Sequence, residues 1–99
     1  MKSYKSILIT GANSGIGRAF AKALAKSQRT LMITGRNQEK LNDLAKQLSS
    51  SNAHIVPVIA DLQNPTDRKE VAKIANQLAV NLFINNAGLG YLDNFTHIS

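Results

Sequence analysis

The sequence predicts an α/β domain built on a doubly wound parallel sheet, and three observations lead to that fold class. Short apolar runs alternate with segments of helical periodicity along the whole chain. The first apolar run leads directly into a glycine-rich turn, "TGANSGIG" at residues 10–17. The third run contains Pro57, which cannot donate to a strand ladder and therefore predicts an edge strand.

Four apolar runs are expected to form the strands, because each is too short for a helix and contains β-branched residues. Continuous apolar runs of this kind are typical of strands buried on both faces, as in a parallel sheet covered by helices. The expected strands are residues 6–10 (SILIT), 30–34 (TLMIT), 54–60 (HIVPVIA) and 81–85 (NLFIN).

Three helices are expected between these strands, each with residues of one face at helical spacing. Asn37 is expected to cap the second helix and Asn64 the third, where Pro65 takes the first helical position. Glu39 and Asp67 place carboxylates near the positive ends of these two helix dipoles. The three faces are Ile16, Phe20, Ala23, Leu24 and Ser27; Leu41, Leu44, Ala45 and Leu48; and Val71, Ile74, Ala75 and Leu78.

The resulting order, β-α-β-α-β-α-β, predicts one domain over residues 1–99 with strand order 3-2-1-4, in which the third strand is an edge. Right-handed crossovers place the first two helices on one face of the sheet and the third on the other. Ligands in such sheets bind at the carboxyl ends of the strands where the strand order reverses, here between strands one and four. The glycine-rich turn and "NNAG" at residues 85–88 both leave the sheet at that point.

The composition limits the class of protein. The chain has no cysteine, which excludes disulfides and thiolate chemistry and fits a reducing compartment. Its N-terminal apolar run is too short for a signal peptide, and no run approaches the length of a membrane span. We therefore expect a cytoplasmic protein without a membrane partner.

The net charge of +6 is unevenly placed along the chain. Residues 1–46 carry nine basic and two acidic side chains, hence +7, whereas residues 47–99 carry three and four, hence −1. This excess fits either solvated helix faces or an anionic ligand near the N-terminal half. Nucleic acid is the weaker interpretation, because only 5% of the residues are aromatic and no basic run is present.

The three glycines of the turn predict a dinucleotide-binding site. Gly11 permits a tight turn out of the strand, Gly15 lets the backbone approach a pyrophosphate, and Gly17 lets the helix pack close to the sheet. A helix that begins near Ser14 directs free N–H groups and a positive dipole end at the predicted crevice, which favours an anion.

With strand, turn and helix in this order, "TGANSGIG" resembles the TGxxxGxG motif of the short-chain dehydrogenase/reductase family, classical type. "NNAG" is similar to that family's second motif, and "ADL" at 60–62 to its acidic position after the third strand. The resemblance runs over essentially the whole chain, which it identifies as the N-terminal, cofactor-binding half of a Rossmann-type domain, truncated with respect to the family.

The resemblance also implies roles for the matching positions, although a strand-bridging role for Asn86 is equally open. Its implied cofactor-binding residues are Gly11, Asn13, Ser14, Ile16 and Gly17 at the phosphates and adjacent ribose, Asp61 and Leu62 at the adenine, and Asn86, Ala87 and Gly88 at the adenosine ribose and the approach to the nicotinamide.

The end of the second strand predicts NADP(H) rather than NAD(H). NAD-binding sheets tend to place an acid about 20 residues past the glycine turn, where it accepts from the ribose 2′-hydroxyl. This chain has Gly35 at that position and Arg36 next to it. A guanidinium matches a 2′-phosphate in charge and in fork geometry, and an arginine here resembles NADP-preferring members of the family.

The sequence does not contain the Tyr-x-x-x-Lys motif that hydride transfer would require. The resemblance implies a Tyr as acid/base with a Lys four residues later, but Tyr4 is followed there by Leu8 and Tyr91 by Phe95. In the family this pair lies beyond "NNAG" by more than the eleven residues that follow Gly88 in this sequence. We therefore expect no catalytic residue within residues 1–99, and no metal-ligand cluster is apparent in the sequence.

Three function hypotheses remain open from the sequence. The first is the NADP(H)-binding portion of a short-chain oxidoreductase that transfers hydride between nicotinamide and an unidentified carbonyl or alcohol substrate. The second is a non-catalytic nucleotide-binding or regulatory module, and the third is a basic nucleic-acid-binding domain. Residues 1–99 alone are expected to be inactive and to form homo-oligomers, because the fourth strand would be an open apolar edge.

Overall fold

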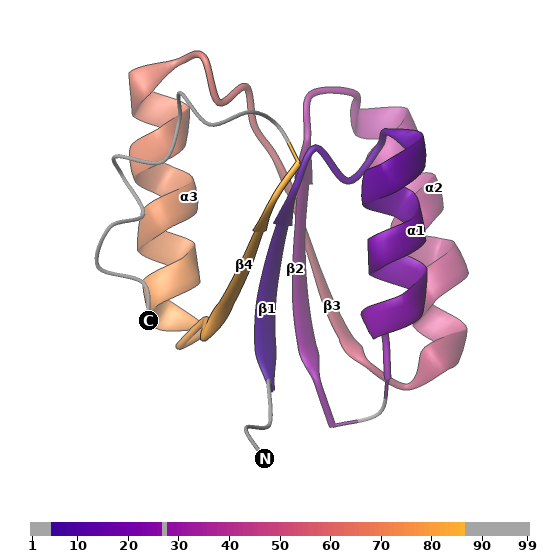
Figure 1. The fold of residues 1–99 in the computed structure, drawn as a ribbon. Coiled ribbons are helices and arrows are strands. Elements are labelled where there is room, and N and C mark those ends of the chain that lie inside the picture. The colour runs from indigo at the N-terminus through magenta and orange to yellow at the C-terminus, as the bar shows by residue number, and fades with distance from the viewer. Residues whose placement is uncertain (1–4, 27, 87–99) are drawn as a thin grey trace.

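The sheet contains four parallel strands in the order β3-β2-β1-β4, which confirms the predicted order (Figure 1). The computed structural model describes residues 5–26 and 28–86. The strands begin and end within one residue of their predicted bounds: β1 is Ser6–Thr10, β2 is Thr30–Gly35, β3 is His54–Ile59 and β4 is Leu82–Asn85. Pro57 lies opposite Ile33 in β3, whose one neighbour in the described sheet is β2, so the expectation from Pro57 is also confirmed.

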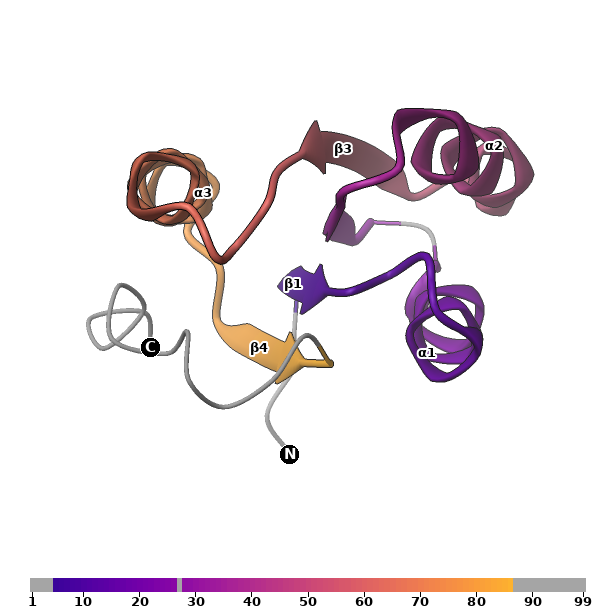
Figure 2. The ribbon, with the colours of Figure 1, turned by 90° about the horizontal axis from the view of Figure 1, so that it is seen from above.

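Three α-helices cover the sheet, with α1 and α2 on one face and α3 on the other, as the crossover rule predicts (Figure 2). Both predicted caps form: the Asn37 side chain accepts from the Lys40 N–H, and the Asn64 side chain accepts from two N–H groups of the next turn. Pro65 occupies the first turn of α3, as expected. The helices are α1, Gly15–Leu24; α2, Gln38–Leu48, followed by a short 3-10 helix, Ser49–Ser51; and α3, Pro65–Gln77.

Each face of the sheet has its own apolar core, because successive side chains of a strand point to opposite faces. Ile7 and Ile9 pack toward α1 and α2, while Leu8 between them packs toward α3. All three side chains are fully buried. Helices therefore cover the centre of the sheet on both faces, and the loops that follow the carboxyl ends of the strands carry the predicted site residues.

The predicted buried face of α1 is wrong. Gly17, Ala21 and Ala25 are buried, whereas Ile16 is 65% exposed and Phe20 is 43% exposed. Small residues let the helix axis come close to the strands, so a stripe of glycine and alanine makes the contact instead of the larger apolar side chains. Of the other residues expected on that face, Leu24 is half-buried, Ala23 is exposed, and Ser27 lies outside the described residues.

Candidate functional site

The turn between β1 and α1 is held by its backbone and by Ser14. Gly11 has a φ of 63°, a left-handed conformation that glycine adopts without steric cost. The Ser14 N–H donates to the Gly11 carbonyl oxygen at 3.2 Å. The Ser14 hydroxyl accepts from the Gly17 N–H at 3.3 Å and so caps α1. The positive end of α1 is therefore fixed at the carboxyl end of β1.

The other two glycines of the turn differ in what surrounds them. A Cβ atom on Gly17 would lie 2.3 Å from the Gly11 carbonyl oxygen and 2.9 Å from the Cα atom of Ala12. A Cβ atom on Gly15 would have no heavy atom of the described structure within 4 Å apart from its chain neighbours and the backbone of its own helix. Packing therefore explains why residue 17 is a glycine, as predicted, but it does not explain Gly15.

Asn86 ties the end of β4 to this turn. Its side-chain amide donates to the Gly11 carbonyl oxygen at 3.1 Å and also to the Ser14 hydroxyl. Its backbone N–H donates to the Thr10 hydroxyl at 3.1 Å. Asn86 thus has the strand-bridging role that the sequence left open beside a ligand contact. The predicted site residues Ala87 and Gly88 lie outside the described residues.

Asn13 connects the turn to the end of β2. Its amide nitrogen donates to the Asn37 carbonyl oxygen at 3.3 Å. The side chain lies over Gly35, where a Cβ atom would come within 2.5 Å of the Asn13 amide nitrogen. Gly35 therefore makes room for Asn13, which occupies the space that a side chain at residue 35 would need.

Asp61 lies at the end of β3 in a loop fixed by α3. The Asp61 N–H donates to the carboxylate of Asp67 at 2.8 Å, and the Asp61 carboxylate accepts from the Gln63 N–H at 3.0 Å. The Arg68 guanidinium donates to the Leu62 carbonyl oxygen at 2.7 Å. The first turn of α3 therefore sets the position of the two predicted adenine-site residues.

Replacing Asp67 with alanine is expected to lower the free energy of unfolding by about 1–2 kcal/mol. The substitution removes the acceptor of the Asp61 N–H and a carboxylate from the first turn of α3. Asp67→Asn keeps an acceptor and should cost less, while Glu70→Ala on the exposed side of the same helix is the control. Urea unfolding followed by circular dichroism measures the differences, and equal stability of Asp67→Ala and Glu70→Ala would contradict this role.

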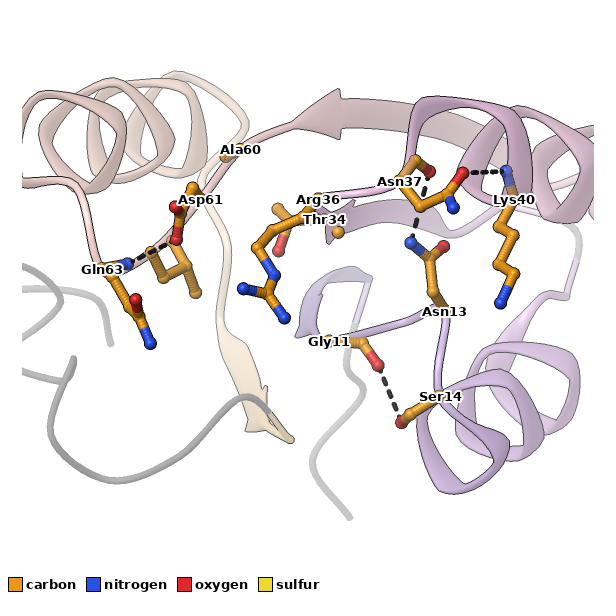
Figure 3. A pocket seen from close by; sticks show the side chains of 12 residues that line it. Gly11, Asn13, Ser14, Thr34, Arg36, Asn37, Lys40, Ala60, Asp61 and Gln63 are labelled. Carbon is orange, nitrogen blue, oxygen red and sulfur yellow. Dashed lines mark hydrogen bonds between the residues drawn. The ribbon is translucent and has the colours of Figure 1, made fainter.

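The carboxyl ends of β1, β2 and β3 surround one cavity of about 420 Å³ (Figure 3). Its volume lies within the range of small-molecule sites, roughly 300–1,000 Å³. The cavity is lined by Gly11, Asn13, Ser14, Thr34, Gly35, Arg36, Asn37, Lys40, Ala60, Asp61, Leu62 and Gln63. Six of the twelve predicted site residues are therefore brought together on its wall.

Two buried polar atoms belong to residues that line this cavity. The Thr34 hydroxyl and the Asn13 side-chain oxygen have no hydrogen-bond partner within the residues that the structure describes. Thr34 itself is 1% exposed. A buried polar group without a partner costs about 1–3 kcal/mol, so such groups are rare in folded proteins and mark places where a partner is missing.

The charges around the cavity favour an anion. Arg36 and Lys40 contribute two cations, and Asp61 is the one acid among the lining residues. In the close view, the Lys40 side chain extends from the first turn of α2 on one side of Asn13, while the Arg36 side chain extends from the segment between β2 and α2 toward the space between Asp61 and Gly11 (Figure 3). Neither side chain forms an ion pair or hydrogen bond that involves only described residues.

Three further predicted residues belong to the first turn of α1 and do not line the cavity. Gly15 and Ile16 are exposed in the first turn of α1, and Gly17 is buried beneath them. Sequence reasoning missed three lining residues, Thr34, Lys40 and Gln63. A usable signal existed only for Lys40, because a basic residue in the first turn of a predicted helix opposes the helix dipole.

No helix in residues 5–26 and 28–86 is both long enough and apolar enough to cross a membrane.

Comparison with known proteins gives a consistent set of relatives. The family model described as short chain dehydrogenase matches residues 5–99. An uncharacterized oxidoreductase of Staphylococcus haemolyticus is 45% identical over 83 residues, which are 83% of this chain and 36% of the relative. A short-chain dehydrogenase of Penicillium roqueforti is 39% identical over 87 residues, 84% of this chain and 34% of the relative. The chain thus spans about a third of the length of these curated relatives.

Solved structures of related proteins match a similar share of this chain and of their own length. A short-chain dehydrogenase from Sphingobium yanoikuyae in complex with NADPH has a TM-score of 0.76 and 35% identity, over 85% of this chain and 34% of that one. The bulky-bulky ketone specific alcohol dehydrogenase from Comamonas testosteroni has a TM-score of 0.78 and 31% identity, over 89% and 37%. L-Sorbose reductase from Gluconobacter frateurii, complexed with NADPH and L-sorbose, has a TM-score of 0.77 and 28% identity, over 88% and 34%.

Proposed function

The chain belongs to the short-chain dehydrogenase family, and from this premise we propose that it is the NADP(H)-binding portion of an oxidoreductase. The whole protein would transfer hydride between the nicotinamide and a carbonyl or alcohol substrate, with residues 1–99 forming the first half of its dinucleotide-binding domain. The cofactor supplies the hydride carrier, and this chain supplies binding and orientation. The observation that carries the proposal is the cavity beside the glycine turn, with its unpartnered polar atoms and two cations.

The residues present fit a dinucleotide. Among the described residues, no other segment lies within 4 Å of the position of a Cβ atom on Gly15, as close approach of a pyrophosphate to the backbone requires. The first N–H groups of α1, at Gly15 and Ile16, have no acceptors within the helix and can donate to phosphate oxygens. Three solved relatives, at 35%, 28% and 26% identity, are described with NADPH, which supports a nicotinamide dinucleotide as the ligand.

The other predicted residues take the following proposed roles. The Asp61 carboxylate would accept from the adenine amino group, and Leu62 would pack beside the ring, since both line the cavity. Asn86 would hold the turn in its binding conformation through its amide nitrogen. Ala87 and Gly88 would line the adenosine ribose and the approach to the nicotinamide. A cytoplasmic location and self-association stay predictions from the sequence.

A preference for NADP(H) over NAD(H) is part of the proposal. An acid that accepts from the ribose 2′-hydroxyl would stand at residue 35, but Asn13 fills the space of any side chain there. Arg36 lines the cavity next to that position without an ion pair to a described residue. Its guanidinium is free to bind the charged group that distinguishes the two cofactors.

Arg36→Ala is expected to weaken NADPH binding about 10- to 100-fold and to change NADH binding less than about twofold. The lost interaction is a charge-assisted hydrogen bond, roughly 1.5–3 kcal/mol. Isothermal titration calorimetry with both cofactors measures this, with Lys22→Ala as a control that removes one positive charge in the last turn of α1. Equal affinities of the unsubstituted chain for NADPH and NADH would overturn the preference, and binding of neither cofactor would overturn the nucleotide site itself.

A further inference from the structure

The outer edge of β3 presents every second residue's backbone groups away from β2. β3 is the last strand of the described sheet, and β2 is its neighbour there (Figure 2). The N–H groups of His54 and Ala60 donate across this pair at 2.8 Å and 3.0 Å. Bonding to one neighbour alternates along a parallel strand, so the odd-numbered residues between them direct their N–H and carbonyl groups outward. These outward-facing residues are Ile55, Pro57 and Ile59.

Pro57 stands in the middle of this outward row and has no N–H to donate there. Its side chain is exposed, and the following outward residue, Ile59, is 44% exposed. A strand that approached this edge would therefore meet a proline ring at the position where the central backbone donor is needed.

Proline is the one edge-protecting feature found in the described part of this strand. Natural edge strands avoid pairing through charged side chains, bulges, short length, a covering segment or proline. β3 has the uncharged sequence HIVPVI, pairs with β2 in an unbroken register, and is as long as β2 at six residues. The described helices lie over the faces of the sheet and not along this edge (Figure 2). Without its proline, such an uncharged segment of high β-propensity has the signature of strands that pair with copies of themselves.

We propose that Pro57 prevents β3 from pairing with the same strand of a second copy of this chain. In a two-fold symmetric pairing centred on residue 57, the strands run antiparallel and residue 57 of each copy faces its counterpart. Facing residues of this kind exchange both of their N–H···O bonds, and proline removes both. The loop after β3 brings Ala60, Asp61 and Leu62 to the cavity, so a second copy paired here would lie beside the candidate site. The inference does not depend on which ligand that cavity binds.

The test is sedimentation velocity over a range of protein concentrations, with the unsubstituted chain, Pro57→Val, Pro57→Thr and Pro65→Val. Valine and threonine both restore an N–H and favour strands, but threonine carries a polar hydroxyl. Pro65 is the other proline of the chain and is exposed in the first turn of α3, so Pro65→Val is the matched control. The restored N–H at residue 57 points away from β2 and leaves the existing ladder intact, and circular dichroism verifies that each variant is folded.

Both Pro57 variants are expected to self-associate at least about tenfold more tightly than the unsubstituted chain, because the central hydrogen bonds of the pairing are regained. Pro65→Val should behave as the unsubstituted chain does. Amide hydrogen exchange followed by nuclear magnetic resonance should slow at Ile55 and Ile59 in the associated variants, since their outward N–H groups become bonded.

Unchanged self-association of both Pro57 variants would overturn the inference. Tighter association of Pro57→Val alone would overturn it in favour of a contact between apolar side chains. An equal increase in Pro65→Val would overturn it in favour of a general effect of losing a proline. Fast exchange at Ile55 and Ile59 in an associated Pro57 variant would place the contact elsewhere and would also overturn it.

Discussion

Replacing Gly17 with alanine is expected to destabilise the chain by about 2–4 kcal/mol, the largest change in stability among the substitutions considered for this site. The added methyl group would lie 2.3 Å from the Gly11 carbonyl oxygen and 2.9 Å from the Cα atom of Ala12. Both are backbone atoms of a turn fixed by hydrogen bonds, so α1 must move away from β1 to relieve the contact. Overpacking a close contact of this kind typically costs about 1–3 kcal/mol, and loss of the turn's hydrogen bonds adds to that cost.

Gly15→Ala provides the matched control for this experiment. It adds the same methyl group two residues earlier, where no heavy atom of another described segment lies within 4 Å. Gly15 is also not among the residues with positive φ, so alanine fits its backbone and should be neutral or stabilising by up to about 1 kcal/mol. Urea unfolding of the two variants measures the contrast, and equal midpoints would show that the turn yields to the methyl group more easily than its hydrogen bonds suggest.

Replacing Gly15 with valine is expected to weaken NADPH binding at least about 100-fold, which corresponds to roughly 2.7 kcal/mol, without unfolding the sheet. The valine side chain would fill the open space beside the start of α1, where the cofactor pyrophosphate is proposed to lie. Because the φ of Gly15 is not positive, a β-branched residue is not strained there. The substitution thus separates binding from folding.

Calorimetry with NADPH and unfolding by urea, carried out on the same sample, decide this prediction. Gly15→Ala shows whether a single methyl group already interferes with the cofactor, and Lys22→Ala should bind as the unsubstituted chain does. Full NADPH affinity in a folded Gly15→Val chain would mean that the glycine turn shapes the protein and does not contact a pyrophosphate.

The fold could be predicted from the sequence because its signals are local. Pro57 placed β3 at an edge without reference to any other residue, since a missing N–H is a property of proline itself. Asn64 and Pro65 marked the start of α3 within a single turn of chain. The strand order then followed from general rules of connection rather than from particular contacts.

Other parts of the site depend on distances between segments that a sequence does not contain. The burial of Ala21 in place of Phe20 follows from how closely α1 approaches the sheet, which periodicity alone does not specify. In the sequence, residue 35 is notable only because it is not an acid. In the structure, the missing side chain of Gly35 leaves room for the side chain of Asn13, 22 residues earlier. Thr34 is an ordinary strand residue by sequence, and it is distinguished only by a buried hydroxyl that has no hydrogen-bond partner among the described residues.

The bond between Asn86 and the glycine turn also sets an order of events during synthesis. Gly11 and Ser14 leave the ribosome about 70 residues before the amide that holds them, and β1 acquires β4 as a neighbour only at that stage. Contacts between residues so far apart in sequence form late. The intervening chain must first lose conformational entropy, and only then do the contacts stabilise the fold. A nascent chain can therefore pair β1 with β2 early, before the Asn86 amide forms its hydrogen bonds to the turn between β1 and α1. Under the proposed function, bound nucleotide would stabilise only chains in which β4 is already paired with β1.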